Sequence, residues 1–271
     1  MSYVDTPNKK QKHPHYEHQT AKLDLKDNQF SCKKFQKIRN VSTHKNLIKS
    51  FGRIGMCLND KQAVSIPVEH LNRVCFILIN DYDDEDKELG VGPLNDGYLV
   101  GLKHHRLGFK VFYLYNAQSE EFPIFLSFFM KNTTESLTVF YSGRDDNLEG
   151  IEFTNGTLSR SLIGDVIALN ANKQNHLMFI TDSLSGGSVF DISGCPNAVS
   201  FYVQKNGSNN SKEVKQTHGI FTYYFCKITS DCPSITPIRL IERMNPSLNR
   251  FNEVFTCELN NKELGERPIF N

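Results

Sequence analysis

The sequence predicts an α/β protein built on a mainly parallel β-sheet that helices cover on both faces. Apolar runs of about four to eight residues recur along the chain, for example at 73–80 and 177–180, and they are too short to be helices. They are also too uniformly apolar for strands with one face in water, which indicates strands that are buried on both sides. Stretches with helical spacing separate them, and this alternation favours a parallel sheet between two layers of helices.

Six strands are expected, at 73–80, 109–115, 137–141, 177–180, 198–203 and 251–259. Helices are expected at 43–60, 94–107, 119–131, 159–170 and 217–227. Gly108 is a typical residue just after a helix, and Ser119 is a candidate N-cap. The pair Asn155-Gly156 predicts a hairpin turn between two short strands. Along 159–170, the apolar period places Leu162, Ile163, Val166 and Leu169 toward the core.

Length and charge predict one folded domain with a basic extension. The chain has 271 residues and a net charge of +1. Residues 1–53 contain twelve Lys or Arg against four Asp or Glu, whereas the remainder contains nineteen against twenty-six. We therefore expect a basic, flexible extension over 1–60 and a single domain over 61–271.

The same composition indicates where the protein acts. No apolar run is long enough to cross a membrane, and no secretory leader pattern precedes the domain. The seven cysteines are scattered and odd in number, which is typical of reduced, buried thiols. A cytoplasmic protein is expected, with the nucleus as the alternative because of the lysine cluster at 9–12. Neither a membrane nor nucleic acid is expected as a partner.

Two of the predicted strands end in small and charged residues. The run 177–180 leads into Asp182 and then into a Ser/Gly-rich stretch, and the run 137–141 leads into Ser142, Gly143 and Arg144. Carboxyl ends of neighbouring parallel strands meet at one edge of a sheet, where open α/β sheets bind their ligands. The sequence therefore predicts a crevice that contains Ser142, Arg144 and Asp182.

These two stretches resemble motifs of the caspases and metacaspases, a family of cysteine peptidases. Members carry Tyr-Ser-Gly-His-Gly after one strand and Asp-Ser-Cys-x-Ser-Gly after the next. This chain has Tyr-Ser-Gly-Arg-Asp at 141–145 and Asp-Ser-Leu-Ser-Gly at 182–186. The order of the other elements also agrees, so the resemblance covers about 71–260. It implies a caspase-like three-layer sandwich around a mainly parallel, six-stranded sheet.

The resemblance also implies that the catalytic machinery is lost. The family's general base corresponds to Arg144 and its nucleophile to Leu184, while Gly143 occupies the oxyanion-type backbone position. A guanidinium stays protonated at neutral pH and cannot act as a base. Leucine offers no atom that can attack a carbonyl group, whereas cysteine catalysis requires a thiolate near a base. We therefore expect a pseudo-peptidase that is not an enzyme.

The substrate pocket of metacaspases has counterparts in this chain. In that family an acidic pocket accepts Arg or Lys, and the resemblance assigns its residues to Asp96, Ser142 and Asp182. Two carboxylates in a partly dry crevice favour a cationic guest through charge-assisted hydrogen bonds. The implied partner is a protein or peptide bearing Arg or Lys, such as an active caspase-like peptidase that this protein would regulate.

Three alternatives remain open at the level of sequence. Arg144 could fold onto Asp182 and fill the pocket from within. Asp96 and Asp182 could hold the fold by capping backbone N–H groups, with no guest at all. An active endopeptidase that cleaves after Arg or Lys would need a replacement nucleophile and a base, for which the candidates are Ser183 and Ser185 with His104, His105, His176 or His218.

No cofactor is expected, and calcium is the alternative. Many metacaspases are regulated by calcium that a group of Asp side chains holds. Asp191 is the one position here that matches this group, although Asp145 and Asp146 lie after Arg144.

Overall fold

The computed structural model describes residues 41–59, 61–69, 71–82, 89–146, 150–171, 175–205 and 219–270. The lysine cluster at 9–12, most of the acidic segment after Asp81 and the segment with His218 lie outside the described residues.

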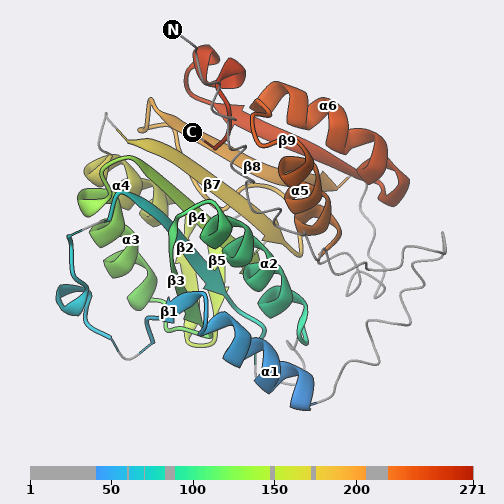
Figure 1. The fold of residues 1–271 in the computed structure, drawn as a ribbon. Coiled ribbons are helices and arrows are strands. Elements are labelled where there is room, and N and C mark those ends of the chain that lie inside the picture. Colours follow the sequence, from blue (N-terminus) through green and yellow to red (C-terminus); the bar gives the residue numbers. More distant parts are fainter. Residues whose placement is uncertain are drawn as a thin grey trace, which may run out of the picture.

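A seven-stranded sheet in the order β1-β3-β2-β4-β7-β8-β9 forms the centre of the molecule (Figure 1). Its strands are β1 (Gly55–Cys57), β2 (Arg73–Ile79), β3 (Lys110–Tyr115), β4 (Ser136–Gly143), β7 (His176–Ser183), β8 (Ala198–Lys205) and β9 (Glu253–Leu259). Every neighbouring pair is parallel except β8 and β9. The predicted mainly parallel sheet is confirmed.

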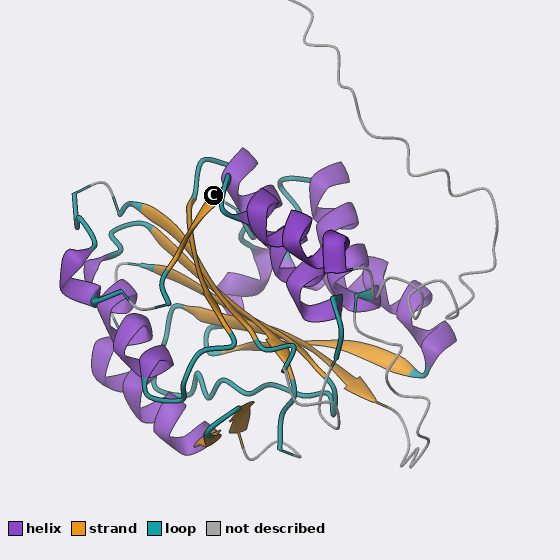
Figure 2. Cartoon of the chain, turned by 90° about the horizontal axis from the view of Figure 1, so that it is seen from below, coloured by secondary structure: helices purple, strands orange, loops and turns teal. Residues whose placement is uncertain are grey.

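Helices cover both faces of this sheet (Figure 2). The helices α3 (Glu121–Asn132) and α4 (Arg160–Asn170) lie on one face, and α1 (Val41–Phe51), α2 (Gly92–Arg106), α5 (Ile220–Asp231) and α6 (Pro237–Leu248) lie on the other. Each face has its own apolar core, because alternate residues of each strand point to opposite sides. The expected three-layer sandwich is thus present.

A short antiparallel hairpin stands beside the main sheet. Its strands are β5 (Gly150–Phe153) and β6 (Gly156–Ser159), which pair from Gly150 with Ser159 to Phe153 with Gly156. Gly156 has a φ of 143°, a conformation that glycine adopts without steric cost. The turn predicted at Asn155-Gly156 is confirmed.

The sheet has seven strands rather than six because the segment before residue 61 joins it. We expected 1–60 to be a flexible extension, yet α1 and β1 are part of the fold over 41–59. Phe51 is fully buried and stacks on Tyr113, with ring centroids 4.1 Å apart. The helix predicted at 43–60 is shorter in the structure, because α1 ends at Phe51 and Gly55–Cys57 form β1. Residues 41–59 therefore belong to the folded region.

Two further details differ from the expectations. The helix α6 was not expected, although Thr236 caps it, Pro237 begins it and Leu240, Met244 and Leu248 form its buried stripe. In α4, Leu162 and Leu169 are 47% and 84% exposed instead of pointing inward. The buried stripe of α4 consists of Ile163 and Ile167, one turn apart, because a helix on a sheet buries a narrow face.

Candidate functional site

The three residues of the predicted acidic pocket meet at the carboxyl edge of the sheet. Ser142 on β4 and Asp182 on β7 are direct neighbours in the strand register. Asp96 reaches them from α2, and the Ser142 hydroxyl donates to Asp96 Oδ2 at 3.4 Å. Asp96 lies within the helix rather than in the turn after the first strand.

The Asp96 carboxyl group is enclosed. It is fully buried, and its Oδ1 has no hydrogen-bond partner among the described residues. Gly219, the N-cap of α5 with a φ of 95°, lies against this atom, since a Cβ there would be 3.2 Å from Oδ1. Burial and the negative charge of Asp182 raise the pKa of Asp96 well above its usual range. The protonated form of Asp96 is therefore favoured more than it would be at an exposed position.

Asp182 is bound by the same helix. The Thr222 hydroxyl in the first turn of α5 donates to Asp182 Oδ2 at 2.6 Å. The positive end of a helix dipole also favours a carboxylate at this position. Asp182 is 6% exposed, so both carboxyl groups lie beneath the surface.

Arg144 does not enter the acidic site. Its Nε donates to Glu152 Oε2 at 3.3 Å, on the hairpin strand β5. Tyr141 donates its hydroxyl to the Arg144 carbonyl, and the Tyr82 hydroxyl accepts from the Arg144 N–H at 3.1 Å. The self-plugged arrangement, with Arg144 on Asp182, is therefore wrong for this structure, because Glu152 neutralises the guanidinium instead.

Hydrogen bonds join the loops after β4 and β7 around Arg144 and Leu184. The Leu184 N–H donates to the Gly143 carbonyl at 3.2 Å. Asp145 Oδ1 accepts from the Ser185 N–H at 2.9 Å, and burial raises the pKa of Asp145. Gly143 pairs with Ser183 in the strand register. Arg144 follows Gly143 in the chain, and Leu184 follows Ser183. Arg144 and Leu184 are thus neighbours in space.

Neither candidate serine nucleophile has a histidine base in the described chain. The Ser185 hydroxyl donates to the carbonyl of Asp145 at 3.2 Å. The Ser183 side chain interacts with the Asp145 carboxyl group and opposes the rise in its pKa that burial causes. Among the described residues, neither serine contacts an imidazole, which a Ser–His pair requires as its base.

The candidate histidines lie elsewhere in the described chain. His104 is fully buried, and its Nδ1–H donates to the Val100 carbonyl at 2.8 Å while Nε2 accepts from Thr138 at 3.1 Å. Burial lowers the pKa of His104 to about 3, so it is neutral and structural. His176 begins β7, at the end opposite to Asp182, and His105 is exposed near the end of α2. His218 lies outside the described residues.

The residues named for calcium do not form a cluster. Asp191 Oδ1 accepts from the Ser193 N–H at 3.0 Å, and this contact lowers the pKa of Asp191. In the described ranges, no group of three or more His, Cys, Asp or Glu residues is arranged to hold a metal ion. None of the described helices is both long and apolar enough to span a membrane. The six described cysteines are free thiols.

Solved structures identify the architecture that carries this site. The structure of pro-sf-caspase-1 matches 72% of this chain and 94% of its own chain, with a TM-score of 0.55 and 13% sequence identity. The fold is caspase-like. The Drosophila initiator caspase Dronc, a second structure with this caspase-like fold, matches 74% of this chain and 83% of its own, with a TM-score of 0.53 and 13% identity. No protein-family model and no curated protein matches the sequence.

The caspase-like fold confirms the architecture that the two motifs implied. The roles of individual residues rest on the contacts described above. Two of these contacts could not be anticipated from the sequence: Thr222 holds Asp182, and Glu152 pairs with Arg144. The partners in the first contact are 40 residues apart in the chain, and no local pattern marks either one.

A second polar cluster at the carboxyl edge was also missed. Asp81, just after β2, accepts from the Tyr115 hydroxyl at 2.6 Å and from the Asn116 amide at 2.7 Å. His44 on α1 contacts the same carboxylate at 3.3 Å. These contacts attach α1 to the ends of β2 and β3. The acidic segment after β2 gave no indication that its first residue is buried.

Proposed function

We propose that this protein is a caspase-like pseudo-peptidase that binds a Lys or Arg side chain of another protein without cleaving the chain. The observation that carries the proposal is Asp96 Oδ1, a fully buried carboxyl oxygen without a hydrogen-bond partner beside Asp182. An unpartnered buried polar atom costs about 1–3 kcal/mol, so a donor from outside the described chain accounts for its retention.

The contacts of Asp96 argue against a role in capping alone. Among the described residues, Asp96 accepts the Ser142 hydroxyl and no backbone N–H. A carboxylate that served as a cap would accept at least one backbone N–H group. A guanidinium or ammonium group between Asp96 and Asp182 would supply both the missing donor and the opposite charge.

Binding of a cation is expected to release a proton. Burial and Asp182 raise the pKa of Asp96, which favours its protonated form without a guest. A cationic guest favours the ionised form, so affinity is expected to rise with pH until Asp96 is ionised without the guest. The implied partners are basic segments, including those at which an active caspase-like peptidase would cleave.

The absence of chemistry follows from Arg144 and Leu184. Neither side chain can act as a base or a nucleophile, and the described histidines do not contact Ser183 or Ser185. A basic segment that enters the site would therefore be held rather than cut, and the protein would act as a decoy or a regulator.

The proposal is tested with a version in which the dyad is restored. The natural chain and an Arg144→His plus Leu184→Cys variant are incubated with fluorogenic peptides that end in Arg, Lys or Asp, with and without calcium. We expect the natural chain to be silent and the restored chain to cleave after Arg or Lys and not after Asp. The neighbouring positions of residues 144 and 184 make the restored pair geometrically reasonable.

Controls separate the acidic site from general effects. Asp182→Asn in the restored chain should lower kcat/KM for the Arg substrate by at least about tenfold. Asp165→Asn, an exposed change on α4, should leave it unaltered. Cleavage by the natural chain that Ser183→Ala or Ser185→Ala abolishes would show that a new nucleophile has taken over. A restored chain that prefers Asp would refute the basic-residue pocket.

A further inference from the structure

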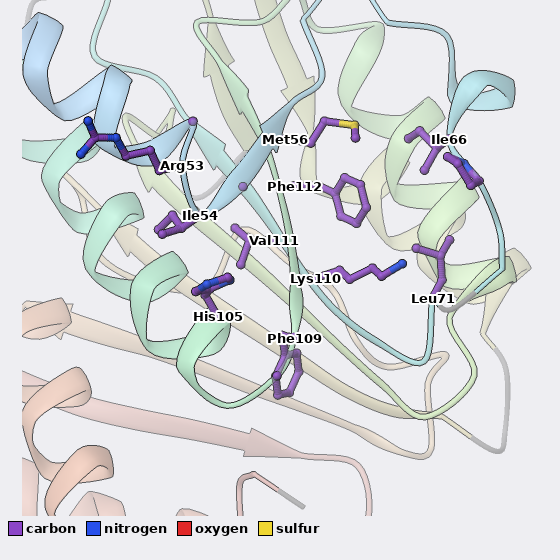
Figure 3. Close-up of a pocket in the computed structure, with 14 residues that line it drawn as sticks. Arg53, Ile54, Met56, Ile66, Leu71, His105, Phe109, Lys110, Val111 and Phe112 are labelled. Atoms are coloured by element: carbon purple, nitrogen blue, oxygen red, sulfur yellow. The ribbon is translucent and has the colours of Figure 1, made fainter. Parts of the chain in front are cut away.

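We propose that the groove at the β1 edge of the sheet is a docking site for an extended peptide that carries acidic side chains next to apolar ones. The groove has a volume of about 760 Å³ and lies where β1 pairs with β3 (Figure 3). It is independent of the acidic site. His105 in the groove and Asp96 are nine residues apart on α2, or about 14 Å along the helix, and point to different edges.

The groove has an apolar floor that crosses the edge of the sheet. Ile54 and Val111 line it on the side of α1 and α2, and Met56, Phe112 and Leu71 line it on the other side (Figure 3). Met56 is 45% exposed. Val111, Phe112 and Leu71 are almost fully buried, so Met56 and the partly exposed Ile54 supply the apolar surface that a guest would contact.

Gly55 allows β1 to lie close to β3 at the floor of the groove. A Cβ at Gly55 would lie 2.9 Å from Val111 Cγ1, so only glycine permits this close pairing of β1 with β3. The edge strand β1 has three residues, and edge strands present a backbone along which another extended chain can lie. An extended peptide therefore suits the shape of the groove.

The charged residues of the groove are all basic. Arg53, His105 and Lys110 line it and are exposed, and no Asp or Glu is among the lining residues. In the described part of the chain, none of these three side chains has an ion-pair partner. The cations Arg53 and Lys110 beside an apolar floor are complementary to acidic side chains that flank an apolar one.

The positive charge of the groove also favours some ligands over others. The segment 1–40 of this chain is itself basic, so it would be repelled by Arg53 and Lys110. Nucleic acid binds chiefly through many phosphate contacts, whereas this groove offers two permanent cations on a largely apolar surface. The chemistry of the lining thus favours an acidic and apolar peptide.

The test uses the labelled full-length chain on immobilised pools of short peptides. One pool alternates Asp or Glu with Leu, Val or Phe. A second pool has Lys or Arg in place of the acids, and a third has Ser in place of the apolar residues. We expect saturable binding to the first pool that is weakened by salt, and at least about tenfold weaker binding to the other two.

Variants of the protein assign the binding to the groove. Lys110→Glu and Arg53→Glu should each weaken binding about tenfold, and Met56→Asp should do the same through the floor. Lys131→Glu makes the same change of charge at an exposed position of α3 and should have no effect. All four side chains are exposed, so thermal melts should show that the fold is retained.

Several results would overturn the proposal. These are equal binding to acidic and basic pools, binding that survives Lys110→Glu and Arg53→Glu, or no binding to any pool. Tighter binding of single-stranded DNA would assign the groove to nucleic acid. Self-association in sedimentation that Met56→Asp abolishes would assign it to a second copy of the chain.

Discussion

Asp96 and His104 are two buried titratable residues on one helix, and their pKa values are shifted in opposite directions. Asp96 has one hydroxyl partner and a second acid beside it, and both burial and that acid raise its pKa. His104 has a partner for each ring nitrogen, and burial lowers its pKa to about 3. His104 is therefore neutral at pH 7, and the raised pKa of Asp96 favours its neutral form as well. The difference is that Asp96 Oδ1 has no hydrogen-bond partner among the described residues, which makes Asp96 the candidate for binding.

The stability of the protein should depend on pH through Asp96. Because its pKa is raised on folding, the folded state binds more protons than the unfolded state above about pH 4. Stability is then lost as pH rises through the raised pKa. Asp96→Asn carries no ionisable group, so it should increase the free energy of unfolding above about pH 4. Urea unfolding at several pH values measures this.

The difference between Asp96→Asn and the natural chain should shrink as pH falls toward about 4, where both carry a neutral group in either state. His104 contributes equally to both proteins and cancels in the comparison. Asp165→Asn, at an exposed position of α4, serves as the matched control and should show no such trend. A variant that is less stable than the natural chain at neutral pH would contradict the assignment.

At the scale of elements, the close approach of α2 to β2 and β3 positions Asp96. Gly97 and Gly101 face the sheet, and a Cβ at Gly97 would lie 2.5 Å from Ile79 Cδ1. These two glycines, one turn apart, allow the helix to lie nearer to the strands than any side chain would permit. The parallel register of β4 and β7 then places Ser142 and Asp182 beside Asp96.

Gly97→Ala should therefore destabilise the protein and disturb the acidic site. The added methyl group meets the well-packed side chain of Ile79, and overpacking of this kind costs about 1–3 kcal/mol. Gly52→Ala is the control, because a Cβ there would have ordinary contacts of 3.5 Å or more. Thermal or urea unfolding distinguishes the two changes. Equal stability of both variants would show that the helix can shift without cost.

At the scale of the whole molecule, two apolar cores on opposite faces of one sheet make a single folded unit. Residues 41–59 belong to this unit, since α1 packs on α2 and β1 pairs with β3. The polar cluster of His44, Asp81 and Tyr115 attaches the same segment to the carboxyl edge. Removal of one large contact of α1 should thus lower the free energy of unfolding of the whole protein.

Phe51→Ala should lower the free energy of unfolding by about 3–5 kcal/mol, because a fully buried ring that stacks on Tyr113 is lost. Phe251→Ala removes a ring that is 40% exposed and should cost less than about 1 kcal/mol. Far- and near-ultraviolet circular dichroism should report one coincident transition in each case. A Phe51→Ala protein with unchanged stability would mean that 41–59 is an appendage after all.

The sequence by itself determined the architecture of the sheet and the place of the site. Apolar runs buried on both faces, with helical patterns between them, admit few arrangements other than a parallel sheet between helices. The polar residues that follow β4 and β7 had to meet, because neighbouring parallel strands end at the same edge. Local chemistry was enough for these inferences, including the turn at Asn155-Gly156.

Only the tertiary structure decided what each polar side chain contacts. Arg144 pairs with Glu152 rather than with Asp182, and Asp182 meets Thr222 from a distant helix. It also decided that 41–59 is part of the fold and that Leu162 and Leu169 face outward. These outcomes depend on distances between elements far apart in the chain. Hydrogen bonds and ion pairs form or fail within tenths of an ångström, whereas a hydrophobic pattern tolerates several ångströms.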